Sequence, residues 1–140
     1  MYKEKIFKSC SNIVKDEVNN SLMGWIFRRP LFESIDNNLF FHKTIQDEIV
    51  GFCICKLMKR TNVIKIEKIG VQNEYRSQGI GFDLLNEVKK LGLPIRLDVV
   101  KKNKQAVDFY LRNGFEVIGK KTLGSDIDVL IMEQGNKTIE

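Results

Sequence analysis

The sequence has few of the residues that mark a metal site, a disulfide framework or a membrane segment. Its 140 residues include one histidine, His42, and three cysteines, Cys10, Cys53 and Cys55. One histidine leaves too few ligands for zinc, so no metal is expected. Cys53 and Cys55 fall on one face of an apolar strand pattern, where small buried side chains are the usual role. No apolar run approaches the roughly 18 residues of a membrane span. Met1–Lys5 leads into no signal-peptide apolar region. We therefore expect a cytoplasmic protein with no membrane contact.

The length and the net charge of the chain limit the number of domains and the kinds of partner that it can have. A chain of 140 residues can bury one core without metal or disulfides, so we expect a single domain over residues 1–140. The net charge is +5, and short lysine clusters lie at 56–60, 101–104 and 120–121. Because these clusters fall at the ends of expected elements, solvated lysines are favoured over a nucleic-acid footprint, which stays the weaker alternative. A homodimer is left open.

Apolar periodicity predicts strands and helices that interleave in the middle of the chain, with hairpins near both ends. Strands are expected at 3–7, 39–43, 49–58, 63–71, 95–100, 115–121 and 126–133, and helices at 11–22, 79–91 and 104–112. Asn103 is a good N-cap for the last helix, and Gly114 ends it. The fold class expected is α/β (α+β), with a mixed, mostly antiparallel central sheet flanked by helices.

The run Arg76-Ser77-Gln78-Gly79-Ile80-Gly81 lies where a strand passes into a helix. Such a junction points unpaired amide groups and the positive end of the helix dipole at one spot, and glycine lets an anion approach the main chain. A dinucleotide fingerprint would need a small residue where Leu84 stands, and a P-loop would need Lys-Ser/Thr after Gly81. A phosphate group of another ligand is expected here; the alternative is a tight turn that serves helix packing.

Arg-x-x-Gly-x-Gly after a strand, followed by Leu-Leu on the helix, resembles the acyl-CoA pyrophosphate loop of the GNAT superfamily of N-acyltransferases. A second block, strand 95–100, Asn103, a helix with Phe-Tyr and then Asn113-Gly114-Phe115, is similar to the same family. Asn73 stands where the family usually has proline. The resemblance implies acetyl-CoA as co-substrate, with no metal. It places the following residues against the cofactor: Ile69, Gly70, Val71, Arg76, Ser77, Gln78, Gly79, Ile80, Gly81, Phe82 and Asn103.

The resemblance also implies where the reaction takes place. The strands that end at Val71 and begin at Ile95 would diverge, and the pantetheine arm would pair with main chain around Ile69 and Val71 as an added strand does. Tyr110 would protonate the leaving thiolate; its alternative role is a core tyrosine. Glu67 or Asp98 would act as the base, with water or no dedicated base as the alternative. Each carboxylate could instead be a salt-bridge partner of Lys65, Lys68 or Arg96.

The resulting expectation is an acetyl-CoA-dependent N-acetyltransferase. The acceptor would be a primary amine of a small molecule, protein or peptide, attacking directly in a ternary complex because no cysteine of the matched blocks stands in a nucleophile position. Trp25, Phe27 and Phe32 could line an acceptor pocket or belong to the core. The alternatives are a non-catalytic CoA- or partner-binding module and a nucleic-acid-directed protein.

Overall fold

A computed structural model describes residues 38–135 of the chain. The strand expected at 3–7, the helix expected at 11–22 and the aromatic residues Trp25, Phe27 and Phe32 lie outside these residues. The elements, in chain order, are β1 Leu39–Ile45, β2 Glu48–Met58, β3 Val63–Val71, the 3₁₀ helix η2 Asn73–Tyr75, α3 Ile80–Lys89, β4 Ile95–Val100, α4 Lys104–Arg112, β5 Glu116–Leu123 and β6 Ile127–Gln134.

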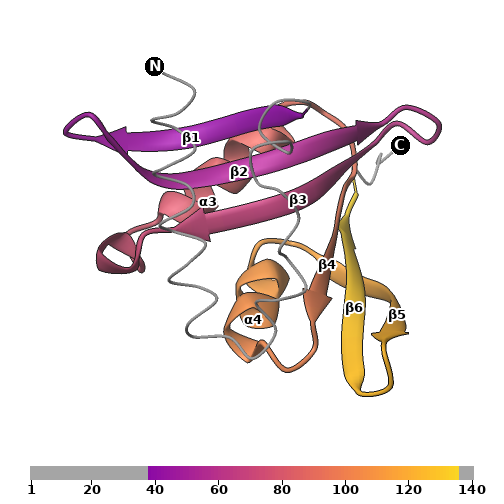
Figure 1. The fold of residues 1–140 in the computed structure, drawn as a ribbon. Coiled ribbons are helices and arrows are strands. Elements are labelled where there is room, and N and C mark those ends of the chain that lie inside the picture. Colours follow the sequence, from indigo (N-terminus) through magenta and orange to yellow (C-terminus); the bar gives the residue numbers. More distant parts are fainter. Residues whose placement is uncertain (1–37, 136–140) are drawn as a thin grey trace.

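The strands form one six-stranded sheet in the order β1-β2-β3-β4-β6-β5 (Figure 1). Each neighbouring pair is antiparallel except β3 and β4, which are parallel and joined through α3. This is the mixed, mostly antiparallel sheet that the sequence predicted, and the boundaries of β3, β4 and α4 agree with the prediction residue for residue. That residues 1–140 form one domain stays a prediction.

Helices α3 and α4 lie over different parts of this sheet. α3 packs against β1, β2 and β3, and α4 packs against β4. Four apolar residues of α3 recur at helical spacing, so they form one face of the helix, and all four are buried: Ile80, Leu84, Leu85 and Val88. They join one core cluster with strand residues that include Cys53, Ile66 and Leu97. None of the helices within 38–135 is long and apolar enough to cross a membrane.

Gly51 on β2 allows the beginning of α3 to approach the sheet closely. A Cβ atom at this position would lie 2.7 Å from Cγ2 of Ile80 and 3.3 Å from Cδ1 of Leu84, whereas carbon atoms in contact normally stay about 3.5–4.0 Å apart. We expect Gly51→Ala to lower the free energy of unfolding by about 1–3 kcal/mol through overpacking, measured by urea denaturation.

Gly119 on β5 is the matched control for this substitution. A Cβ atom there would meet Cδ1 of Ile131 at 3.6 Å, which is ordinary van der Waals contact. Gly119→Ala should therefore leave stability within about 0.5 kcal/mol of the parent protein. Equal losses in the two variants would contradict the close approach of α3 at Gly51.

Candidate active site

Strands β3 and β4 begin side by side and then separate. Their parallel pairing consists of Ile64 with Ile95 and Lys65 with Arg96. Beyond these pairs the two backbones run apart, and Figure 1 shows them leaving their common start in different directions. We call this divergence, between 67–71 on β3 and 97–100 on β4, the fork.

A β-bulge on β3 lies at the start of the fork. In the pairing of β2 with β3, Ile54 faces Lys68 and Cys55 faces Ile66, so Glu67 is the inserted residue of the bulge. A bulge bends its strand and increases the local twist. It also changes which residues face the helices, since Ile66 before the bulge and Ile69 after it both pack in the core cluster. The bulge thus lies just beyond the last residue pair that joins β3 to β4.

The main-chain groups of Ile69 and Val71 point into the fork. The amide of Gln72 donates to the carbonyl of Val50 on β2 at 2.7 Å. Main-chain groups of successive strand residues point to alternate sides, so those of Gly70 point toward β2 and those of Ile69 and Val71 toward β4. These groups therefore face the fork, and their pairing with an extended ligand stays a prediction.

The loop after β3 is held by the side chain of Arg76. Its Nε donates to the carbonyl of Val71 at 3.1 Å, and its Nη1 donates to Oδ1 of Asn73 at 3.2 Å. Nε2 of Gln78 donates to the carbonyl of Glu74 at 3.4 Å. Asn73, the residue that stands in place of proline, thus helps to orient Arg76. These contacts fix the loop between β3 and α3.

The N-terminus of α3 presents amide groups and little side chain. Gly79, the N-cap, has a φ of 82° in the left-handed region, and no side chain caps the helix. The first main-chain bond runs from the amide of Asp83 to the carbonyl of Gly79 at 2.9 Å. The amides of Ile80, Gly81 and Phe82 are therefore left without an acceptor among residues 38–135. Such a group of amides, at the positive end of a helix, suits a phosphate.

The two glycines of this junction have different roles. A Cβ atom at Gly79 would meet nothing within 4 Å, so the space beside this residue is open to a ligand. A Cβ atom at Gly81 would lie 2.9 Å from Cζ of Phe109 on α4. Gly81 therefore has a packing role, as the alternative interpretation of this junction allowed, while Gly79 keeps the approach open. Ser77 also has a positive φ, 66°.

Asn103 caps helix α4, and Tyr110 lies within it. Oδ1 of Asn103 accepts from the amide of Ala106 at 3.3 Å, which agrees with its predicted role as N-cap. Tyr110 is 7% exposed and belongs to the core cluster. Its ring lies edge-on to those of Phe109 and Phe115, each at 5.4 Å between centroids. Tyr110 is thus packed as a core residue. A role for its hydroxyl group in proton transfer stays a prediction.

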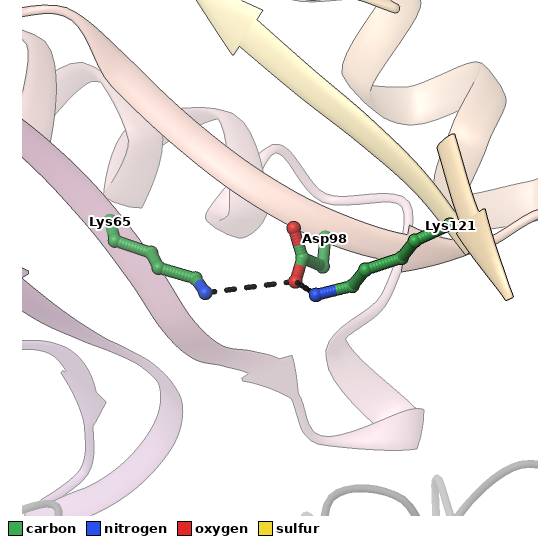
Figure 2. A network of polar contacts seen from close by, with 3 residues as sticks. All are labelled: Lys65, Asp98 and Lys121. Carbon is green, nitrogen blue, oxygen red and sulfur yellow. Dashed lines mark hydrogen bonds and ion pairs between the residues drawn. The ribbon is translucent and has the colours of Figure 1, made fainter. Parts of the chain in front are cut away.

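The two candidate bases have different surroundings. Glu67 is half-buried at the bulge that opens the fork. Asp98 lies on β4, where its Oδ2 accepts from Nζ of Lys121 at 2.8 Å and lies 3.6 Å from Nζ of Lys65 (Figure 2). Asp98 therefore has the salt-bridge partners that the sequence offered as its alternative role. Which of the two carboxylates acts as a base stays a prediction.

Residues 7–115 match the family described as the acetyltransferase (GNAT) family. The chain belongs to this family. The family predicted from the sequence is thereby confirmed.

Two curated relatives are similar in sequence to this chain. The chain is 33% identical over 102 residues to an uncharacterized N-acetyltransferase of Methanocaldococcus jannaschii, covering 66% of this chain and 42% of that protein. It is 28% identical over 120 residues to the peptidyl-lysine N-acetyltransferase YjaB of Salmonella typhimurium, covering 86% of this chain and 70% of that protein. The chain thus spans less than half of the first relative's length and about two thirds of the second's.

The fold is also shared with solved GNAT structures. An aminoglycoside 6′-N-acetyltransferase complexed with coenzyme A matches with a TM-score of 0.73 at 15% identity, covering 91% of this chain and 89% of that one. This likeness confirms the predicted fold class.

Within the GNAT fold, the structure brings most of the predicted cofactor residues to one edge of the sheet. The strand end at Ile69–Val71, the loop 76–79 and the start of α3 follow one another along the chain, and α4 packs beside them through Phe109. Their role in binding stays a prediction. Sequence reasoning missed Lys121 and Phe109, whose parts depend on contacts between separate elements, whereas Lys65 was among the salt-bridge partners that it offered for Asp98.

Proposed function

We propose that this GNAT protein transfers an acetyl group from acetyl-CoA to a primary amine of a small molecule or a peptide, by direct attack of the amine. The observation that carries the proposal is the continuity of the fork with the N-terminus of α3. An extended pantetheine arm along Ile69 and Val71 would leave its pyrophosphate at the amides of Ile80 and Gly81. The co-substrate supplies the acetyl group as an activated thioester.

Residues of the fork and Tyr110 of α4 would then stabilise the developing charge and transfer the protons. An amide near Val71 would donate to the carbonyl oxygen as negative charge develops on it. Glu67 would accept the proton that the amine loses, with Asp98 as the second candidate. Tyr110 would donate a proton to the sulfur as the carbon–sulfur bond breaks. The acceptor nitrogen thereby gains the acetyl group, and one proton passes from amine to base while another passes from tyrosine to thiolate.

The described cysteines support direct transfer over a covalent acyl-enzyme. Cys53 and Cys55 are buried, with their Sγ atoms 3.6 Å apart. The hydrogen bond to Cys55 and burial raise the pKa of the Cys53 thiol well above its usual range. Since the thiolate is the nucleophilic form, Cys53 is a poor acyl carrier.

The acceptor class is best decided by a thiol-release screen. Peptides with an internal lysine head the panel, because one relative is a peptidyl-lysine N-acetyltransferase. Aminoglycosides follow, because a protein of the same fold acetylates them, together with polyamines and amino acids. Release of thiol with one class, and a matching mass increase of 42 Da on the acceptor, would support the proposal. Binding of acetyl-CoA with no release from any class would instead identify a non-catalytic CoA-binding module.

Gly79→Ala is expected to weaken acetyl-CoA binding. Acetyl-CoA at about 100 times its dissociation constant should stabilise the parent protein by about 2.7 kcal/mol. The added methyl group would occupy the open space beside the start of α3, and we expect a loss of affinity of roughly tenfold or more. Isothermal titration calorimetry measures the loss, and a thermal scan measures the stabilisation.

Gly92→Ala is the matched control, because Gly92 follows the other end of α3. Its φ is 78°, close to the 82° of Gly79, and a Cβ atom there would also meet nothing within 4 Å. Both substitutions should therefore cost about 1–2 kcal/mol in backbone strain, but Gly92→Ala should bind acetyl-CoA as the parent does. Equal affinities in the two variants would show that the pyrophosphate does not lie at Gly79.

A further inference from the structure

The carboxylate of Asp98 lies between two lysines that come from different strands. Figure 2 shows Lys65 of β3 on one side and Lys121 of β5 on the other, with both ammonium groups directed at the same oxygen. Oδ2 of Asp98 is 2.8 Å from Nζ of Lys121 and 3.6 Å from Nζ of Lys65. We call these three residues the Asp98 bridge.

The bridge lies where the fork begins. Lys65 belongs to the last residue pair that joins β3 to β4, and Asp98 stands two residues beyond its partner Arg96. The ion pair between Lys65 and Asp98 therefore reaches diagonally across the line at which the backbones part. On its other side, Asp98 pairs with Ile131 of β6, and Lys121 reaches it from β5, one strand further away. One carboxylate thus connects β3, β4 and β5.

The bridge lies on the sheet face that α3 and α4 do not cover. Leu97 and Val99 of β4 pack in the core cluster with these helices, and side chains alternate along a strand, so Asp98 points to the opposite face. On the same face and strand, Arg96 donates to Oε1 of Glu133 on β6 from Nη2 at 2.7 Å and from Nε at 2.9 Å. That pair holds β4 to β6, and the Asp98 bridge adds a link from β4 back to β3.

The side chains of the Asp98 bridge are partly shielded from solvent, so they can hold a fixed arrangement. The side chain of Asp98 is 23% exposed, that of Lys65 34% and that of Lys121 46%. An isolated surface ion pair contributes little, but a carboxylate shared by two cations forms a small network. Lys65 and Lys121 repel each other, and the negative carboxylate between them offsets this repulsion. Loss of the charge of Asp98 should therefore push the two lysines apart.

We propose that the Asp98 bridge sets the separation of β3 and β4 in the fork, and that Asp98 is a positioning residue for the pantetheine arm. The inference rests on the proposed function, since it assigns the fork to acetyl-CoA. An arm that pairs with Ile69 and Val71 as an added strand needs the opposite strand at a fixed distance. The bridge supplies this fixed distance from the face opposite the helices, and the pyrophosphate site at α3 lies outside its reach.

Two ligands that differ by the pantetheine arm test the inference. Coenzyme A and 3′-phosphoadenosine 5′-diphosphate, its nucleotide part alone, are titrated by calorimetry into the parent protein, Asp98→Asn and Lys121→Met. We expect coenzyme A to bind Asp98→Asn about three- to tenfold more weakly, and Lys121→Met about two- to fivefold more weakly, because each lost ion pair is worth little alone. Binding of the nucleotide should be unchanged in both variants.

Lys120→Met is the matched control, because Lys120 is the exposed neighbour of Lys121 on β5 and carries the same charge. It should bind both ligands as the parent does, and Lys121→Arg, which keeps the cation, should restore most of the affinity for coenzyme A. Equal losses for the two ligands, or no loss for coenzyme A in Asp98→Asn, would overturn the inference. A fall in kcat of Asp98→Asn with unchanged affinity would make Asp98 the base. Failure of the parent protein to bind coenzyme A would overturn the proposed function itself.

Discussion

Glu67→Gln is expected to lower kcat by about 10²–10⁴ with the preferred amine acceptor. A primary amine is mostly protonated at pH 7, so it must lose a proton before or during its attack. Glu67 is half-buried at the bulge that opens the fork, within the segment that would flank the thioester. The glutamine side chain keeps the shape but cannot accept the proton. The residual rate should then rise with pH only as the amine itself ionises, which a pH–rate profile from thiol release would measure.

Asp98→Asn is the companion to this variant. Asp98 is engaged by two lysines, so its loss should act through the geometry of the fork, raising the KM for acetyl-CoA more than it lowers kcat. If instead Asp98→Asn abolishes turnover while Glu67→Gln is nearly silent, the two roles are exchanged. Small effects of both variants, with the full pH dependence retained, would mean that the acceptor loses its proton to solvent.

The strands and helices of the described residues were predicted from local patterns in the sequence. β3, β4 and α4 have the predicted boundaries, and β1, β2, α3, β5 and β6 differ from prediction by one or two residues at one or both ends. These segments combine a clear apolar period with turn or cap residues at their ends, such as Asn103 and Gly114 around α4. The hairpin between β1 and β2 turns on Gln46 and Asp47, both with positive φ, as a two-residue turn requires.

The bulge at Glu67 was not predicted, although the sequence carries a signal for it. Apolar residues fall on one face at Ile64 and Ile66, and then at Ile69 and Val71, so the alternation shifts by one residue across Glu67. A strict period of two would place Ile69 on the opposite face. Such a shift within one strand is the mark of an inserted residue. The fork itself was inferred from the family resemblance.

The features of the site that could not be predicted from the sequence depend on contacts between separate elements. The approach of Phe109 to Gly81 depends on how α4 lies beside α3. The ion pairs of Asp98 depend on the sheet order, which places β5 beyond β6 and within reach of β4. Neither the spacing of residues along a strand nor their composition fixes these relations. The sequence offered Lys65, Lys68 and Arg96 as partners for Asp98, and the structure pairs it with Lys65 and also with Lys121.

Tyr110→Phe is expected to lower kcat by about 10²–10⁴ while leaving the fold and coenzyme A binding in place. The ring of Tyr110 is held between Phe109 and Phe115 at 5.4 Å from each, and phenylalanine keeps these contacts. Loss of the hydroxyl group should change the free energy of unfolding by about 1 kcal/mol or less. Turnover should fall much further, because the thiolate would leave without its proton donor. Thiol release at saturating substrates measures kcat, and calorimetry with coenzyme A measures binding.

Tyr75→Phe is the matched control, since Tyr75 lies in η2 and also packs against the core cluster. It should retain the kcat of the parent protein. If Tyr110 is the proton donor, the loss of kcat in Tyr110→Phe should be smaller with acyl donors whose thiols have a lower pKa. Such thiolates leave readily without being protonated. If turnover of Tyr110→Phe equals that of Tyr75→Phe with every donor, then Tyr110 serves packing alone and water protonates the leaving thiolate.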